Sequence, residues 1–246
     1  MNAIERIVTI TARLRDPDTG CEWDRAQGLA TIAPYTIEEA YEVADAIARL
    51  DMPALVDELG DLLFQVVLLS EIARQSGAFD LNAVATAIAD KMERRHPHIF
   101  GTATQRPDWE TLKAAERSDT GSALDGVALG LPALMRAAKL QKRAARVGFD
   151  WPDAAGPRAK IDEELLEVAT APDAGSRHEE VGDLLFSVVN YARHLDVDPE
   201  AALRDATAKF ERRFKTIEVE PNFAELSLEH QEALWQAAKA DQAPRD

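Results

Sequence analysis

GDLLFQVV occupies residues 60–67 and GDLLFSVV occupies residues 182–189, so seven of the eight letters recur in the second half of the chain. A glutamate stands two residues before the glycine in both copies, at Glu58 and at Glu180. The apolar letters would pack a helix against its neighbours, whereas the acids around the glycine would not. The repeat therefore predicts two similar units with acidic residues at fixed places on a helix.

The composition is typical of a helical protein. The 246 residues are 46% hydrophobic, with 12 Gly, 12 Pro and 6% aromatic residues, and helix-favouring Ala, Leu, Glu and Arg dominate. A formal net charge of −16 argues against sequence-independent binding of nucleic acid or of an anionic membrane. It suits a protein that gathers divalent cations on carboxylates, or one with a solvated acidic surface.

The cysteine content and the N-terminal sequence indicate the compartment. Cys21 is the only cysteine, so no intrachain disulfide forms and a reducing, cytoplasmic location is expected. The first residues, MNAIERIVTITARLRDP, carry charges inside their apolar pattern, unlike a signal peptide. The longest apolar run, LLFQVVLLS, is too short to cross a bilayer. We therefore expect no membrane partner.

Apolar residues at helical spacing run through both halves. The first half has TIEEAYEVADAIARL (36–50), LVDELGDLLFQVVLLSEIARQ (55–75) and a third helix that Asp80 would cap and Pro97 would end. The same order returns in IDEELLEVAT (161–170), EEVGDLLFSVVNYARHL (179–195) and DPEAALRDATAKFERRFKTI (198–217). We predict an all-α fold of tandem duplicated helical bundles, with an N-terminal domain at 1–118, a linker at 119–130 and a C-terminal domain at 131–246.

Alignment of the two halves brings polar residues of the same type into register. Each half has the order E-E-x-x-E, E-x-x-D, K-x-x-x-R, W-x-x-x-K. In the first half these letters are Glu38, Glu39, Glu42, Glu58, Asp61, Lys91, Arg95, Trp109 and Lys113. In the second half they are Glu163, Glu164, Glu167, Glu180, Asp183, Lys209, Arg213, Trp235 and Lys239.

The two acidic motifs have the spacing of a metal site. Residues three apart share a helix face, so Glu39 projects with Glu42, and Glu58 projects with Asp61. Two such helices packed antiparallel would cluster four carboxylates, and a hard divalent cation would relieve their repulsion. Carboxylate oxygens favour Mg²⁺, with Mn²⁺ as a substitute.

The basic and aromatic motifs would turn such a metal site into a nucleotide site. A Lys and an Arg four apart place two cations on one helix face, where they would hold a chain of phosphates together with the Lys that follows each Trp. The Trp offers a ring on which a base could stack. A di-iron site is disfavoured, because its Glu-x-x-His pair occurs once, at Glu93 and His96, and the second half has Phe214 in the place of the His.

Each motif taken alone has a simpler explanation. One E-E-x-x-E motif is usually a solvated helix face, Lys and Arg often pair with acidic helices to little effect, and a single Trp is more often a core anchor. Gly60 and Gly182 each cost a helix about 0.5–1 kcal/mol relative to Ala, which indicates that a neighbouring helix approaches closely there. The occurrence of the whole order twice favours the nucleotide site.

Longer strings resemble the MazG family, the two-domain nucleoside triphosphate pyrophosphohydrolases of the all-α NTP pyrophosphatase superfamily. The similar strings are GCEWD (20–24), TIAPYTIEEAYEV (31–43), ELGDLLFQVV (58–67), KMERRHPHIF (91–100), LPALMRAAKLQKRAARVGFDW (131–151) and KFERRF (209–214). The resemblance covers nearly the whole chain. It implies homodimers and Mg²⁺-dependent hydrolysis of a nucleoside triphosphate between the α and β phosphates, which releases the monophosphate and pyrophosphate.

The resemblance also assigns roles to residues. The metal ligands would be Glu39, Glu42, Glu58 and Asp61 in the first copy and Glu164, Glu167, Glu180 and Asp183 in the second. The leading acids Glu38 and Glu163 would orient or deprotonate the attacking water. The substrate-binding residues would be Lys91, Arg95, Trp109, Lys113, Lys209, Arg213, Trp235 and Lys239, with cations that stabilise the leaving pyrophosphate. The second copy is expected to be the better catalyst.

One departure from the family pattern lies between the acidic motifs of the second half. The segment APDAGSRH (171–178) is expected to be a short loop with Arg177 as its one strong cation. Two alternatives to a broad house-cleaning enzyme stay open: a narrow dUTP or dCTP pyrophosphatase, and a non-catalytic nucleotide-sensing module.

Overall fold

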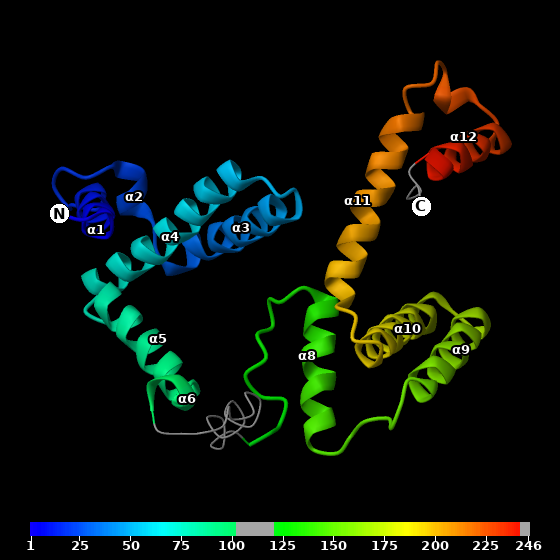
Figure 1. Ribbon diagram of the computed structural model, residues 1–246, viewed down its shortest axis with the longest axis horizontal. Coiled ribbons are helices and arrows are strands. Elements are labelled where there is room, and N and C mark those ends of the chain that lie inside the picture. Colours follow the sequence, from blue (N-terminus) through cyan, green and yellow to red (C-terminus); the bar gives the residue numbers. More distant parts are fainter. Residues whose placement is uncertain (102–120, 242–246) are drawn as a thin grey trace. The chain divides into compact units, whose positions relative to one another are not determined.

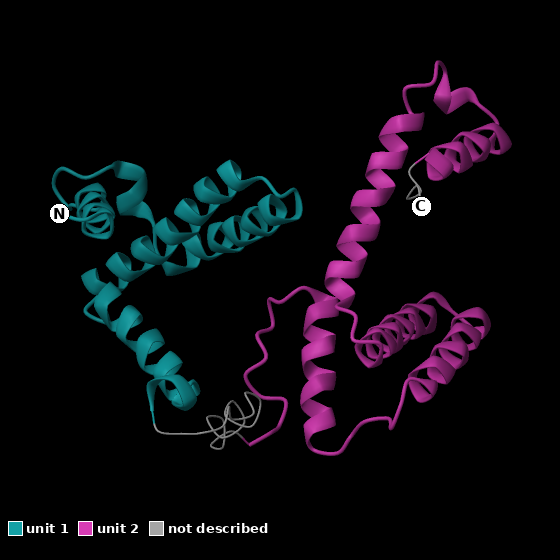
Figure 2. Cartoon of the chain, in the orientation of Figure 1, with its two compact units in different colours: residues 1–118 teal, residues 119–246 magenta. Residues whose placement is uncertain are grey.

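The computed structural model describes residues 1–101 and 121–241, and within them the chain is helical with no strand, which confirms the all-α prediction (Figure 1). It divides into two compact units, Met1–Ser118 and Asp119–Asp246 (Figure 2). The first unit contains α1 (Ala3–Leu14), α2 (Glu22–Ala26), α3 (Leu29–Ala48), α4 (Met52–Gln75), α5 (Leu81–Arg95) and α6 (Pro97–Phe100). The second contains α8 (Ala133–Arg146), α9 (Ala155–Thr170), α10 (Ala174–His194), α11 (Pro199–Ile217), η1 (Phe223–Glu225) and α12 (Leu228–Asp241).

The first unit is built on a hairpin of α3 and α4. The connection is only three residues long and turns at Leu50, which has a left-handed φ of 55°. Asp51 then starts α4, because its side chain accepts a hydrogen bond from the Ala54 amide at 3.1 Å. α1 and α5 pack on the C-terminal half of α4, where Val67 and Leu68 are buried. This half of α4 anchors the unit, and its N-terminal half carries the acids.

The second unit repeats the hairpin with α9 and α10. Asp173 caps α10 by accepting from the Ser176 amide at 2.9 Å. The expectation of a loop over 171–178 is therefore wrong: only residues 171–173 connect the helices, and Arg177 lies in the first turn of α10. α8 packs against α10 as α1 packs against α4.

The last two long helices form an arm of the second unit. α11 contacts α8 and the end of α10 near its own N-terminus and then leads away from the hairpin of α9 and α10 (Figure 1). α12 packs mainly on α11. Phe210, Phe214, Phe223 and Trp235 join the two helices, with the rings of Phe210 and Trp235 at 5.3 Å between centroids. The arm thus has a small aromatic core of its own.

Matching faces of both hairpins are left uncovered. Leu59, Leu63 and Val66 of α4 are 49%, 40% and 36% exposed, and their counterparts in α10 are exposed as well. An added Cβ at Gly60 or at Gly182 would meet nothing within 4 Å. The expected close approach of a neighbouring helix at these glycines is therefore not found within the described chain.

No helix among the described residues combines the length and the apolar character that crossing a membrane requires.

Candidate metal centres

The first acidic cluster joins α3 to α4. Glu39 comes from α3, and Glu58 and Asp61 come from successive turns of α4. One carboxylate oxygen from each of the three lies within 4.8 Å of the others. Glu39 and Glu58 are half-buried and Asp61 is exposed. The spacing of three residues on α4 has produced the shared face that the sequence predicted.

The second cluster repeats this geometry between α9 and α10. Glu164, Glu180 and Asp183 again bring carboxylate oxygens within 4.8 Å of one another. Glu164 is only 3% exposed, and its Oε2 is buried without a hydrogen-bond partner among the described residues. A buried carboxylate oxygen with no donor is costly unless something positive meets it.

Of the four metal ligands predicted for each copy, one lies beside the cluster rather than within it: Glu42 in the first unit and Glu167 in the second. Neither Glu42 nor Glu167 belongs to the groups whose oxygens lie within 4.8 Å. Burial raises the pKa of Glu39, Gln65 opposes this with a hydrogen bond, and the charges of Asp61 and Glu42 raise it further. The contact with Glu164 raises the pKa of Glu167, and burial adds to the effect. These carboxylates therefore repel one another at close range.

The innermost acid has a different partner in each copy. In the first unit the amide of Gln65 donates from Nε2 to Glu39 Oε1 at 3.2 Å. In the second unit the ammonium of Lys160 lies 2.7 Å from Glu164 Oε1 and 2.9 Å from Glu163 Oε1. Those two acids raise the pKa of Lys160, which keeps it charged. Sequence reasoning missed both partners, although Lys160 stands four residues before Glu164, the spacing of a helical ion pair.

The two leading acids lie outside the clusters. Glu38 and Glu163 are both exposed, and Glu163 is held by Lys160. Each is the residue directly before a cluster acid, so its side chain points to a different side of the helix from that acid. Their role toward water stays a prediction.

Three of the predicted cations, Lys91, Lys209 and Lys239, are not paired with the carboxylates of their own unit among the residues that the structure describes. Arg213 lies over the Trp235 ring, 6.0 Å from its centroid, on the arm that leads away from the second cluster. Arg95 ends α5. Trp109 and Lys113 fall outside the described residues.

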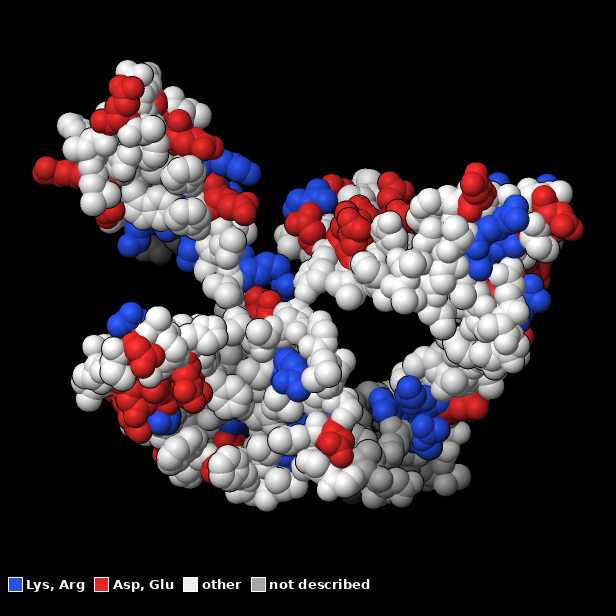
Figure 3. All heavy atoms as spheres, turned by 180° about the vertical axis from the view of Figure 1, so that it is seen from behind, with Lys and Arg blue, Asp and Glu red and all other residues white. Residues whose placement is uncertain are grey.

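The donor set suits a hard divalent cation. Each cluster offers carboxylate oxygens alone, from two helices, with exposed positions left for water or for phosphate. Acidic side chains gather over the hairpin of α3 and α4 and over that of α9 and α10 (Figure 3). The unpartnered Glu164 Oε2 is the atom that such a cation would satisfy. The clusters are therefore compatible with the binding of a divalent metal ion.

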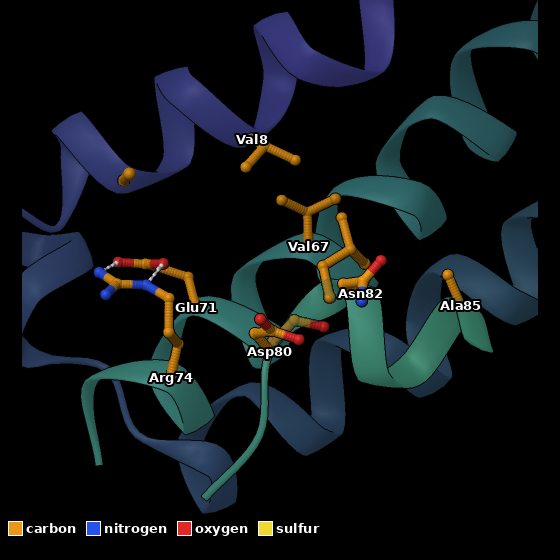
Figure 4. Close-up of a pocket in the computed structure, with 10 residues that line it drawn as sticks. Val8, Val67, Glu71, Arg74, Asp80, Asn82 and Ala85 are labelled. Carbon is orange, nitrogen blue, oxygen red and sulfur yellow. Dashed lines mark hydrogen bonds and ion pairs between the residues drawn. The ribbon is translucent and has the colours of Figure 1, made fainter. Parts of the chain in front are cut away.

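A cavity of about 480 Å³ in the first unit lies apart from its cluster, between α1, α4 and α5 (Figure 4). Its buried polar groups already have partners. Glu71 pairs with Arg74 at 2.7 Å, Ser70 donates to the Val66 carbonyl, and Asp80 caps α5 through the Ala83 amide. This cavity therefore offers no unsatisfied buried group to a ligand.

Comparison with known proteins fits this geometry. The sequence model of the family described as the MazG nucleotide pyrophosphohydrolase domain matches residues 27–100 and again residues 158–217. These two segments contain the two clusters. A nucleoside triphosphate pyrophosphohydrolase of Escherichia coli K12 is 49% identical over 97% of this chain and 98% of its own length. A nucleoside triphosphate pyrophosphohydrolase/pyrophosphatase MazG of Thermotoga maritima is 44% identical over 96% of this chain and 95% of its own. The uncharacterised protein YabN of Bacillus subtilis is 41% identical over 94% of this chain and 50% of its own length.

Proposed function

Because the chain belongs to the MazG nucleotide pyrophosphohydrolase family, we propose that it hydrolyses nucleoside triphosphates between the α and β phosphates, releasing the monophosphate and pyrophosphate. The observation that carries the proposal is the acidic cluster that each matched segment builds between two helices. We place the activity in the cytoplasm, where the exposed thiol of Cys21 would stay reduced.

In this proposal the metal is held by the acids of each hairpin. The ligands are Glu39, Glu58 and Asp61 with Glu42 beside them, and Glu164, Glu180 and Asp183 with Glu167 beside them. Bound Mg²⁺ would neutralise phosphate charge and acidify a water molecule. The geometry of three close carboxylates supports this role, since a divalent cation would offset both the burial and the repulsion from Asp61 and Glu42 that raise the pKa of Glu39.

The other polar residues would accept the proton of the attacking water, position a metal ligand and bind the leaving group. Glu163 is exposed beside the cluster and would accept a proton from the attacking water, as Glu38 would in the first copy. Lys160 is charged and lies against Glu164, so it would hold that carboxylate in place. The cations of the arm, Lys209, Arg213 and Lys239, would bind the departing pyrophosphate.

We also propose that the active form is a homodimer. The arm leads away from the hairpin of its own unit, so its cations would reach the cluster of a second copy (Figure 1). The exposed apolar residues of α4 and α10 and the open space at Gly60 and Gly182 are where helices of that copy would pack. Such packing would explain glycine inside an otherwise favourable helix.

Pyrophosphate release tests the proposal. The whole chain, with Mg²⁺ and each of the eight common ribo- and deoxyribonucleoside triphosphates and also dUTP, is compared with Glu180→Gln and with Glu179→Gln. The two variants remove neighbouring carboxylates of α10, and only Glu180 belongs to a cluster. We expect Glu180→Gln to lower the rate and Glu179→Gln to match the wild type. Absence of pyrophosphate with all nine nucleotides would favour a nucleotide-sensing module, and turnover of dUTP or dCTP alone would favour the narrow enzyme.

A further inference from the structure

The two acidic clusters carry matching carboxylates, but the residues beside them differ in charge. Every acid of the E-E-x-x-E and E-x-x-D motifs in the first unit has an acidic counterpart in the second. The residue four positions before the innermost acid does not match: it is Tyr35 before Glu39 and Lys160 before Glu164. Carboxylates of equal number attract a divalent cation alike, so a difference in affinity would come from such neighbours.

The second cluster has a positive charge at its innermost acid. The ammonium of Lys160 lies 2.7 Å from Glu164 Oε1 and 2.9 Å from Glu163 Oε1. Glu164 is 3% exposed, and its other oxygen, Oε2, is buried without a hydrogen-bond partner among the described residues. The carboxylate thus keeps one oxygen open to a cation while Lys160 occupies the other.

A cation bound at that open oxygen would lie close to the ammonium. The separation would be at most about 7 Å, because a ligand oxygen lies about 2.1 Å from Mg²⁺ and both oxygens belong to one carboxylate. At about 7 Å, a single and a double positive charge repel strongly enough to weaken binding about tenfold, even at the dielectric constant of water. Lys160 therefore opposes the cation that Glu164 attracts.

The first cluster has only neutral groups at the corresponding places. Tyr35 brings no charge, and its ring meets the edge of Trp23. Gln65 is 7% exposed and donates from Nε2 to Glu39 Oε1 at 3.2 Å. Its Oε1 is buried and has no hydrogen-bond partner among the described residues. A water molecule bound to a cation is a donor of the kind that this oxygen lacks.

We propose that the first cluster binds a divalent cation in the nucleotide-free protein, and that Lys160 keeps the affinity of the second cluster about tenfold lower. A triphosphate brings negative charge that offsets the ammonium, so the second cluster takes its cation together with the nucleotide. This inference rests on the metal role in the proposed function, and it adds the order in which the two clusters fill and the residue that sets this order.

The test measures metal binding without nucleotide. Mn²⁺ is titrated into the whole chain at low ionic strength, where charges are least screened, and free Mn²⁺ is followed by electron paramagnetic resonance. Glu180→Gln disables the second cluster and Glu58→Gln disables the first, so each chain reports on the cluster that is left. We expect the Glu58→Gln chain to show a dissociation constant about tenfold higher than that of the Glu180→Gln chain.

Two reciprocal variants assign the difference to the ammonium. In the Glu58→Gln background, Lys160→Met should lower the dissociation constant about tenfold, whereas Lys142→Met, which removes an exposed lysine of α8, should leave it unchanged. In the Glu180→Gln background, Tyr35→Lys places a lysine four residues before Glu39 and should raise the constant about tenfold. Tyr35→Met is the matched control, because it removes the ring without adding charge.

The inference is overturned if Lys160→Met binds Mn²⁺ no more tightly than its parent, or if Tyr35→Lys binds like Tyr35→Met. Should Lys160→Met fail to fold, the Tyr35 pair decides alone. Pyrophosphate release by the same chains separates the two proposals. The expected order of affinities without any release would refute the proposed function only, and the absence of Mn²⁺ binding at both clusters would refute both.

Discussion

The two hairpins hold the same acids in different surroundings. In the first unit Glu39 is half-buried and accepts a hydrogen bond from the neutral side-chain amide of Gln65. In the second unit Glu164 is 3% exposed and lies against the ammonium of Lys160. The second cluster therefore has part of its negative charge offset before any cation binds. The two copies share the clustered carboxylates, whereas the residues that support these carboxylates differ.

Removal of one acid from each copy gives the largest expected effect. In the proposed site Glu167 binds the metal from beside the cluster, and loss of a metal ligand costs several kcal/mol of transition-state stabilisation, so Glu167→Gln should lower kcat/KM for pyrophosphate release by about a hundredfold or more. Glu42→Gln should have a small effect, because we expect the second copy to carry most of the turnover. Equal losses in both variants would show that the two copies work alike.

Substitution of Lys160 and of Gln65 tests whether a charged partner supports its carboxylate more strongly than a neutral one. Lys160→Met leaves the buried Glu164 without its cation and should lower the free energy of unfolding of the second unit by about 1–3 kcal/mol. Gln65→Met removes a single neutral donor and should lower that of the first unit by about 1 kcal/mol. Thermal unfolding in chelator and in Mg²⁺ measures both. An equal loss of unfolding free energy in the two variants would show that the charge of Lys160 adds nothing to the support of Glu164.

The segments around Trp23 and Trp151 are held by different contacts in the two units, and this difference predicts a dependence on pH. In the first unit Arg15 donates to the Asp24 and Gln27 carbonyls, which do not titrate. In the second, Arg193 lowers the pKa of Asp150 from its usual 3.8. A lowered carboxylate pKa stabilises the fold above the unfolded value, and this stability is lost as the pH falls through the folded value.

Acid should therefore weaken the contact between Asp150 and Arg193 below about pH 4 and leave the bonds from Arg15 to the two carbonyls intact. Asp150→Asn should lower the free energy of unfolding of the second unit by about 1–2 kcal/mol at neutral pH and remove this part of the acid dependence. Denaturant unfolding from pH 7 to pH 3 provides the measurement. An unaltered acid dependence in the variant would assign it to other carboxylates.

The smallest expected effect concerns the open glycines. Within one chain an added methyl group at Gly182 meets nothing within 4 Å, so Gly182→Ala should stabilise α10 by about 0.5–1 kcal/mol. In the proposed dimer a second helix lies there, so the same change should weaken self-association in sedimentation. Gly60→Ala repeats the test in the first unit. Stabilisation without any change in association would place the dimer contact elsewhere.

Much of the fold followed from local rules in the sequence. Helical periodicity identified the hairpins, and a spacing of three residues placed Glu58 with Asp61 and Glu180 with Asp183. The clustering of these pairs with Glu39 and Glu164 required only that the helices be antiparallel neighbours. These features depend on contacts within a helix or between consecutive helices, and a sequence pattern captures such contacts well.

The features that the sequence did not predict depend on tertiary packing or on a helix boundary. Segment 171–178 was expected to be a loop, yet Asp173 caps a helix there and leaves only three connecting residues. Gln141 meets Phe186 across two helices that are far apart in sequence. The cavity that both residues line is a property of shape, which no spacing reveals.

The ring of Trp151 rests over Gly156, where an added Cβ would lie 2.5 Å from the ring atoms. Its counterpart Trp23 instead meets the edge of Tyr35, with 6.1 Å between the ring centroids. The two indoles thus have different neighbours, and Trp151 also lines the cavity of Gln141 and Phe186. The protein therefore carries a fluorescent reporter in each unit. Chains that retain one tryptophan or the other would show optically which unit responds when nucleotide is added.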